Sequence, residues 1–225
     1  MAFDRVVDAI EEVAAGKRQN HITEPDAALV YGKRRSVTTG GYYAYLKIAE
    51  GCDKRCTYCI IPKVRGSYRS VPMETLVEEA GRLAEGGVRE LILVAQETTV
   101  YGKDLYGRKA LPELLKRLCA IPGLYWIRLL YCYPEEITEE LIETIRTEPK
   151  ICHYLDMPIQ HASDRILKKM GRKTNQQELR ERIARLREQI PDICLRTTLI
   201  SGFPGEEQED FVTLYNFVDE LEFDR

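Results

Sequence analysis

From residue 42 onward the sequence changes between strand-like and helix-like segments five times in succession. The predicted strands cover residues 42–49, 88–95, 125–131, 152–158 and 193–201. Each is followed by a predicted helix: one that ends at Gly86-Gly87, then 111–120, 139–147, the pair 164–170 and 175–189, and 207–221. Repeated strand–helix units predict a parallel sheet with helices packed outside it. The expected fold class is therefore α/β.

Local signals define several helix limits and faces. Thr138 is a predicted N-cap for the helix 139–147, and Thr174 and Gln177 have the spacing of a capping box. Apolar residues at helical spacing predict the buried faces of two helices: Leu76, Val77, Ala80, Leu83 and Ala84 in the first, and Leu179, Ile183, Leu186 and Ile190 in the helix that Thr174 would open.

The first 40 residues have a different pattern. Residues 2–16 read as an amphipathic helix, and residues 17–40 are polar without periodicity, which predicts a linker or irregular arm. Lys33, Arg34 and Arg35 form a small basic cluster that we expect to be solvated. The chain therefore divides at about residue 40, with the organised domain at 41–225.

Composition excludes several classes of protein. A net charge of −3 gives no general attraction to nucleic acid, and no apolar run approaches the length of a membrane span. Acidic residues in the first helix argue against a signal peptide, so we expect a cytoplasmic protein without a membrane partner. In that reducing compartment seven cysteines, an odd number, indicate thiols or metal ligands instead of disulfides.

Polar loops follow all five predicted strands. Parallel β/α sheets and barrels form their sites at the carboxyl ends of the strands, so these loops are expected to converge on one rim. In chain order they read "EGCDKRCTYCIIPKVRG" (50–66), "QETTVYG" (96–102), "YCYPEE" (131–136), "PIQHASD" (158–164) and "SGFPGE" (201–206).

Cys52, Cys56 and Cys59 in the first of these loops have the spacing C-x3-C-x2-C. Two kinds of site fit three thiolates. One is a zinc site whose fourth ligand comes from elsewhere in the chain, which would make the protein a zinc-stabilised β/α binding protein. The other is a four-iron four-sulfur cluster with one iron left open to a small chelating molecule.

The triplet, with Tyr58 directly before its last cysteine, resembles the signature of the radical S-adenosylmethionine (SAM) superfamily. The resemblance implies a partial (βα)6-type parallel barrel, one four-iron four-sulfur cluster held by Cys52, Cys56 and Cys59, and a bound SAM. It also implies an activity: an electron from the cluster cleaves SAM, and the resulting 5′-deoxyadenosyl radical abstracts hydrogen from an unactivated carbon.

The same resemblance assigns cofactor-binding residues. It places Tyr58 near the adenine, Gln96 and Glu97 near the SAM amino group, and Gln160 and Arg196 near the ribose and carboxylate. A guanidinium can bind a carboxylate through two parallel hydrogen bonds, although Arg196 would equally suit an ordinary salt bridge. Gln96 and Glu97 would also suit the cap of the next helix.

A narrower resemblance covers residues 42–225. The loops together look like the methylthiotransferase family, whose tRNA-modifying branch typically has "QNVN", "TSHP" and "QSGS" after strands two, three and four. This chain has "QETT", "YCYP" and "QHAS". Those differences match the branch that methylthiolates the β-carbon of an aspartate in the twelfth small-subunit ribosomal protein. A core of the tRNA adenosine methylthiotransferase branch is the alternative.

The family resemblance carries further expectations. Members have an N-terminal domain in which three more cysteines hold an auxiliary cluster, and a C-terminal β-barrel module. Residues 1–40 would then be a remnant of the first domain, and the radical SAM core would be truncated before or within its sixth strand. A second SAM would donate the methyl group. The implied partners are the ribosomal protein and a flavodoxin- or ferredoxin-type electron donor, with the enzyme a monomer.

The four remaining cysteines are assigned to packing. Cys119, Cys132, Cys152 and Cys194 occupy apolar contexts in which a thiol behaves as a small hydrophobe, although Cys132 lies on the loop rim. None of the three histidines has metal-ligand spacing. His153 is expected in the core, and His161 within reach of a substrate.

Overall fold

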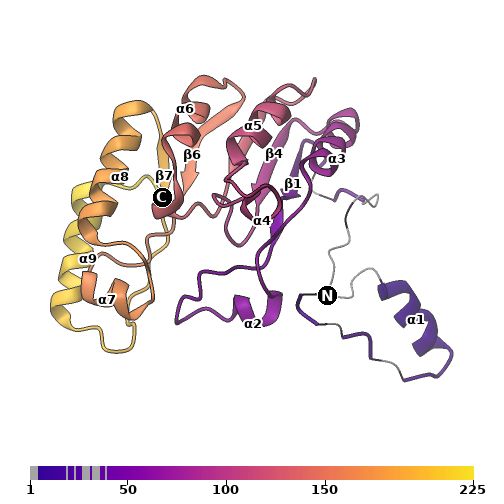
Figure 1. Cartoon of the computed structure of the whole chain (residues 1–225), viewed down its shortest axis with the longest axis horizontal. Coiled ribbons are helices and arrows are strands. Elements are labelled where there is room, and N and C mark those ends of the chain that lie inside the picture. Colours follow the sequence, from indigo (N-terminus) through magenta and orange to yellow (C-terminus); the bar gives the residue numbers. More distant parts are fainter. Residues whose placement is uncertain (1–4, 19, 23, 27–30, 32–35, 39) are drawn as a thin grey trace.

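The computed structural model describes residues 5–18, 20–22, 24–26, 31, 36–38 and 40–225. Its centre is a five-stranded, wholly parallel sheet with the strand order β1-β4-β5-β6-β7 (Figure 1). The strands are β1 (Tyr43–Lys47), β4 (Glu90–Val94), β5 (Trp126–Leu129), β6 (Ile151–Asp156) and β7 (Cys194–Arg196). Neighbours in the sheet follow one another in the chain with helices between them, as the sequence predicted.

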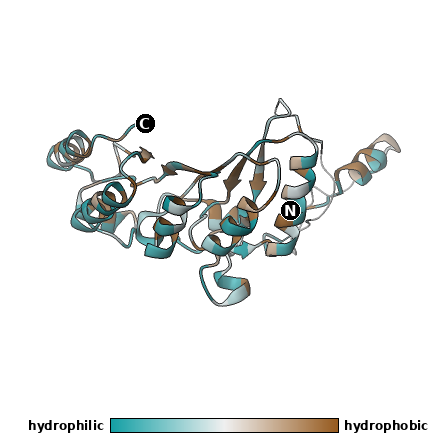
Figure 2. Cartoon of the chain, turned by 90° about the horizontal axis from the view of Figure 1, so that it is seen from above, coloured by the Kyte–Doolittle hydropathy of each residue, from teal (hydrophilic) through white to brown (hydrophobic). Residues whose placement is uncertain are grey.

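Helices cover one face of this sheet. α3 (Met73–Glu85) packs on α5 (Leu111–Cys119), α5 on α6 (Glu139–Thr147), and α6 on α8 (Gln176–Gln189). Viewed from above, the sheet bends around the opposite face, which no helix covers within the described residues (Figure 2). The sheet does not close on itself, and the fold is a partial barrel.

The remaining elements are mostly short. A two-stranded antiparallel ribbon, β2 (Ala49–Glu50) with β3 (Arg69–Ser70), brackets the cysteine loop and α2 (Ile61–Arg65). The predicted strand 42–49 thus divides into β1 and the start of this ribbon. The other elements are α1 (Val6–Ala14), α4 (Lys103–Tyr106), the 3-10 turn η2 (Pro134–Glu136), α7 (Asp164–Lys169) and α9 (Gln208–Leu221).

Strand residues alternate between the two faces. Ala44 and Leu46 of β1, and Leu91 and Leu93 of β4, are buried under the helices, whereas Tyr45 and Trp126 on the open face are exposed. Fully burying one such leucine contributes about 1.5–3 kcal/mol, so the helix-covered layer holds most of the apolar stabilisation. Cys152 and Cys194, which were expected in apolar contexts, are only half-buried, because they lie on the open face.

Helix limits follow the sequence signals with one correction. The Thr138 side chain accepts a hydrogen bond from the Leu141 backbone N–H, which confirms it as the N-cap of α6. α3 ends at Glu85, just before Gly86-Gly87. The capping box at Thr174 and Gln177 was wrong: Asn175 has the extended cap conformation, and its side chain accepts from the Glu178 N–H at 2.9 Å.

The N-terminal part agrees with the sequence only partly. α1 has no buried residue among those described, and the basic cluster at 33–35 lies outside the described residues. The described part of the predicted linker contacts the rest of the chain. Asp26 Oδ1 accepts from the Ser67 backbone N–H at 2.7 Å and from Arg69 at 2.7 Å, so residues 24–26 lie against the end of the cysteine loop. None of the described helices has the length and apolar character needed to cross a bilayer.

Residues 224–225 lie beside the outer edge of β7. The Asp224 N–H donates to the Leu195 carbonyl at 3.0 Å, and the Thr197 N–H donates to the Arg225 carbonyl at 2.8 Å. Residues 224–225 therefore hydrogen bond to β7 at the position where the sixth strand of the predicted barrel would pair.

Candidate functional site

The cysteine loop begins at a glycine that no other residue could replace without strain. Gly51 has φ +78°, and a Cβ at this position would lie 2.0 Å from the Ser67 carbonyl oxygen. This close approach lets the Cys52 N–H donate to the Gly66 carbonyl at 3.2 Å, which closes the loop at its base. A second bond, from the Cys59 N–H to the Cys56 carbonyl at 3.0 Å, forms a tight turn between the last two cysteines.

The tip of the loop is held by the end of α7. The Thr57 N–H donates to the Met170 carbonyl at 3.0 Å, and the Thr57 hydroxyl donates to the Lys169 carbonyl at 2.9 Å. These carbonyls belong to the last turn of a helix and have no partner inside it. The loop is therefore closed at its base, beside the β2–β3 ribbon, and anchored to α7 at its tip.

The three thiols differ in exposure. Cys52 and Cys56 are buried, at 7% and 6% exposure, and Cys59 is partly exposed. Burial, together with the nearby Glu97 carboxyl and the other two cysteines, raises the pKa of Cys52 to about 11. Without a metal this thiol is protonated at neutral pH, so binding iron would release its proton.

The described residues contain no set of three His, Cys, Asp or Glu side chains that converge on one point where a single metal ion would bind. A four-iron cluster makes a different demand, because each cysteine ligates its own iron. Three thiols on one anchored loop are the kind of ligands that such a cluster needs.

A cavity of about 410 Å³ lies over the carboxyl ends of the strands, and we call it the strand-end cavity. Residues from the loops after all five strands line it. Three of the predicted cofactor-binding residues, Tyr58, Gln96 and Gln160, lie there together with Cys59. Gln96 Oε1 is buried and has no hydrogen-bond partner in the described part of the chain, so a residue that lines this cavity carries an unused acceptor.

Backbone strain is concentrated around the same cavity. Two non-glycine residues that line it, Tyr131 and Gln160, have φ of +57° and +70°. Gln160 is held in this conformation from both sides, because its N–H donates to Thr198 and its carbonyl accepts from Ile200. Such conformations cost about 1–3 kcal/mol each and tend to cluster at ligand sites.

The other two predicted cofactor-binding residues lie elsewhere. Arg196 does not line the cavity and forms an ion pair with Asp156, which does. Glu97 faces a second cavity, and its Oε1 atom accepts from the Thr99 backbone N–H at 2.9 Å. Burial raises the pKa of Glu97 to about 7, despite hydrogen bonds from Thr99 and the Lys54 ammonium 3.8 Å away. The structure therefore brings together three of these five residues.

The second cavity, of about 430 Å³, also borders the cysteine loop, and we call it the loop cavity. Cys52 and Cys56 line it, together with Glu97 and Arg172. Tyr133 lines both cavities, and its hydroxyl lies 3.6 Å from the Cys56 sulfur. The three cysteines are thus divided between two cavities, and Tyr133 lines both.

Sequence reasoning missed Tyr133, Asp156 and Arg172. Tyr133 belongs to the quoted "YCYP" loop, and Asp156 is a carboxylate at the end of a predicted strand, so position in a loop after a strand was the available signal. Arg172 follows α7 and carried no such signal. Its proximity to Tyr133, with the guanidinium carbon 4.2 Å from the ring centroid, arises only in the folded chain.

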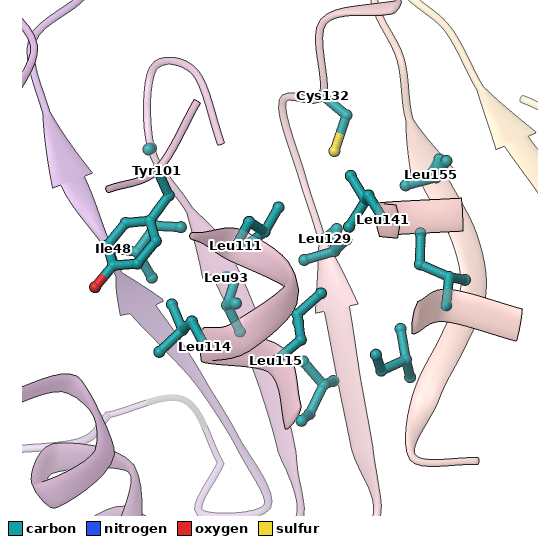
Figure 3. Packing of buried hydrophobic residues seen from close by; sticks show 14 of the residues in the cluster. Ile48, Leu93, Tyr101, Leu111, Leu114, Leu115, Leu129, Cys132, Leu141 and Leu155 are labelled. Atoms are coloured by element: carbon teal, nitrogen blue, oxygen red, sulfur yellow. The ribbon is translucent and has the colours of Figure 1, made fainter. Parts of the chain in front are cut away.

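Cys132 and His161 are both fully buried. The Cys132 sulfur points into the apolar layer among Leu129, Leu141 and Leu155, which confirms packing over ligation (Figure 3). His161, which was expected within reach of a substrate, has its Nδ1 atom accepting from the Ser163 N–H at 2.9 Å and its Nε2 atom 3.7 Å from Glu206 Oε1.

His153 lies at the surface, not in the core as predicted. Its ring is 32% exposed, and Nδ1 is 2.7 Å from Asp192 Oδ1. His153 lies on β6, and helices cover only one face of the sheet, so not every residue of this strand is buried.

Comparisons with known proteins agree with this geometry. The radical SAM superfamily matches residues 46–218. Ribosomal protein uS12 methylthiotransferase RimO of Lachnoclostridium phytofermentans is 62% identical over 224 residues, which are 100% of this chain and 51% of that protein. The protein of the same name from Geobacter sulfurreducens is 52% identical, covering 99% of this chain and 50% of its own length. The chain thus spans about half the length of these curated relatives.

Solved structures show the same fold at low identity. The radical SAM methyltransferase TsrM from Kitasatospora setae, with tryptophan substrate and a SAM analogue bound, has a TM-score of 0.66 at 19% identity. The match covers 87% of this chain and 38% of that one. Methylornithine synthase matches with a TM-score of 0.57 at 13% identity, over 83% of this chain and 53% of that one.

Proposed function

The chain belongs to the radical SAM superfamily, and we propose that it is the catalytic core of an enzyme that methylthiolates the β-carbon of an aspartate in ribosomal protein uS12. The anchored loop with Cys52, Cys56 and Cys59, placed against a cavity at the strand ends, carries the enzymatic part of this proposal. The relatives' names and the "QETT", "YCYP" and "QHAS" loops support the substrate.

The residues present fit the cofactors that the superfamily implies. Cys52, Cys56 and Cys59 would hold one four-iron four-sulfur cluster, which when bound supplies the electron that cleaves SAM. Gln96 and Gln160 would bind SAM in the strand-end cavity, and Tyr58 would pack on its adenine. The Tyr58 ring is already supported edge-to-face by Phe203, with centroids 6.5 Å apart.

Two further cofactor-binding roles need a small rearrangement. Glu97 would bind the SAM amino group only after turning from the loop cavity toward the strand ends. Arg196 would bind the SAM carboxylate only by releasing Asp156, its present partner. Asp156 already lines the strand-end cavity, and we propose that this carboxylate also accepts from the SAM amino group or ribose.

The larger enzyme implied by the relatives accounts for the rest of the reaction. We propose that an auxiliary cluster outside this chain carries the inserted sulfur, and that a second SAM donates the methyl group. A flavodoxin- or ferredoxin-type protein would supply electrons, and the enzyme would act in the cytoplasm as a monomer. Residues 1–40 would connect this core, residues 41–225, to the domain with the auxiliary cluster.

Transfer of deuterium tests the substrate. Ribosomal protein uS12 deuterated at the aspartate β-carbon is incubated anaerobically with the reconstituted chain, SAM and a strong reductant. We expect deuterium in the 5′-deoxyadenosine product, detected by mass spectrometry, because the hydrogen that is removed comes from that carbon. Product without deuterium would contradict the substrate assignment. Deuterium transferred instead from a labelled tRNA adenosine would support the tRNA branch.

Gln96 offers a test of the SAM site. Replacing Gln96 by alanine is expected to weaken SAM binding by about 10- to 150-fold, because an unpartnered buried amide oxygen that gains a charged donor contributes about 1.5–3 kcal/mol. The dissociation constant can be measured by calorimetry on the cluster-loaded protein. Gln208→Ala at the exposed start of α9 is the matched control and should bind like wild type. Equal affinities in Gln96→Ala and wild type would remove Gln96 from the site.

A further inference from the structure

The segment after α7 lies directly against the cysteine loop. Besides the two hydrogen bonds from Thr57, a Cβ added at Gly171 would lie 3.9 Å from the Cys56 Cα and 3.7 Å from the Arg55 carbonyl oxygen. The next residue, Arg172, is therefore placed within the loop cavity that Cys52 and Cys56 line. The contact between Gly171 and Cys56 joins positions that are 115 residues apart in the chain.

The Arg172 side chain is fully buried. Its Nη2 atom lies 3.2 Å from Glu135 Oε2 and 3.4 Å from the Pro158 carbonyl oxygen, and its guanidinium covers the Tyr133 ring. The Nε and Nη1 atoms have no hydrogen-bond partner among the described residues. The guanidinium also interacts electrostatically with Cys56 and Tyr58.

This arrangement leaves two charged hydrogen-bond donors of Arg172 buried without acceptors. A guanidinium stays charged in any protein environment, and burying its N–H groups without acceptors costs free energy. A purely structural ion pair with Glu135 would use Nη2 and leave the N–H groups of Nε and Nη1 without a function. Sulfur atoms of a cluster at Cys56 would be acceptors in the same cavity that Arg172 lines.

We propose that Arg172 hydrogen bonds to the cluster at Cys56 and favours its reduced state. Reduction adds one electron from a low-potential donor to the cluster, with no bond broken and no proton transferred, so the cluster becomes more negative by one charge. Hydrogen bonds to the sulfurs and a nearby positive charge both stabilise that state. The inference rests on the cofactor that the proposed function assigns to this loop.

The test is an anaerobic redox titration of the reconstituted protein, with the reduced cluster quantified by electron paramagnetic resonance. At the solution potential that reduces half of the wild-type clusters, Arg172→Met should lower the ratio of reduced to oxidised cluster by about tenfold, because charged hydrogen bonds to the sulfurs are lost. Arg172→Lys keeps the charge without the planar set of donors and should show a smaller decrease.

Two variants keep the result interpretable. Lys168→Met removes the same charge from an exposed position on α7 and should leave the ratio unchanged. The double variant Arg172→Met/Glu135→Gln is used if the single variant fails to fold. It removes both charges and therefore leaves no unpaired buried carboxylate. This double variant should also be harder to reduce than wild type, since the donors to sulfur are absent.

The outcomes separate this inference from the proposed function. Wild-type ratios in Arg172→Met and in the double variant, with full iron and sulfide content, would overturn the role of Arg172 and leave the cluster assignment intact. An equal decrease in Lys168→Met would show an effect of overall charge and would also overturn it. A wild-type chain that takes up no iron and sulfide would refute the proposed function, and this inference with it.

Discussion

Replacing Cys52, Cys56 or Cys59 by alanine is expected to abolish cluster assembly completely. Two thiolates cannot hold a four-iron cluster against solvent and chelators. Each variant should therefore lose all of its bound iron and sulfide, and not only one third. The measurement is iron and labile sulfide per chain after anaerobic reconstitution and desalting, together with the visible absorption spectrum. A single variant that retained the full content of both elements would contradict the ligand assignment.

The other thiols provide the control for this experiment. Cys119→Ala should leave iron and sulfide unchanged, because Cys119 lies in the α5 packing layer. Cys132→Ala should do the same, at a cost to stability of about 1 kcal/mol or more from the small cavity it leaves. Zinc analysis of the same samples addresses the zinc-binding alternative, which predicts one zinc per chain without labile sulfide.

Gly51→Ala is expected to be nearly as damaging although it removes no ligand. A side chain at φ +78° costs about 1–3 kcal/mol, and the added Cβ would also collide with the Ser67 carbonyl oxygen at 2.0 Å. The backbone fixes the position of the Cβ, and the carbonyl oxygen is itself a backbone atom, so a rotamer change cannot relieve the contact. The loop base would have to open, which would break the bond from the Cys52 N–H to the Gly66 carbonyl.

Two measurements distinguish damage to the loop from damage to the whole fold. Urea unfolding of the cluster-free protein should show a lower free energy of unfolding, and iron content after reconstitution should fall by at least half. Gly81→Ala is the matched control, since Gly81 lies within α3 and a Cβ there meets no atom within 4 Å. It should stabilise the protein by about 0.5–1 kcal/mol. Full stability and iron content in Gly51→Ala would show that the loop tolerates another backbone path.

Features that depend on neighbouring residues in the chain were available from the sequence. The period of Leu179, Ile183 and Leu186 predicted the buried face of α8, and all three are buried. The Thr138 cap and the strand–helix order are equally local, because a helix start needs one side chain and two nearby N–H groups. The cysteine spacing with Tyr58 pointed to the superfamily for the same reason, since the loop that holds them is continuous.

Only the tertiary structure decided how distant segments meet and which positions water reaches. His153 and Cys152 lie on β6 of a sheet covered on one face, so strand periodicity alone could not assign their exposure. Likewise, the Cys56 sulfur meets Tyr133, and Tyr133 meets Arg172, through contacts between three separate loops. Chain order specifies each loop but not the distances between loops, because these depend on how the helices pack against the sheet. The partners of the cysteine triplet are therefore a property of the fold, whereas the triplet itself can be read in the sequence.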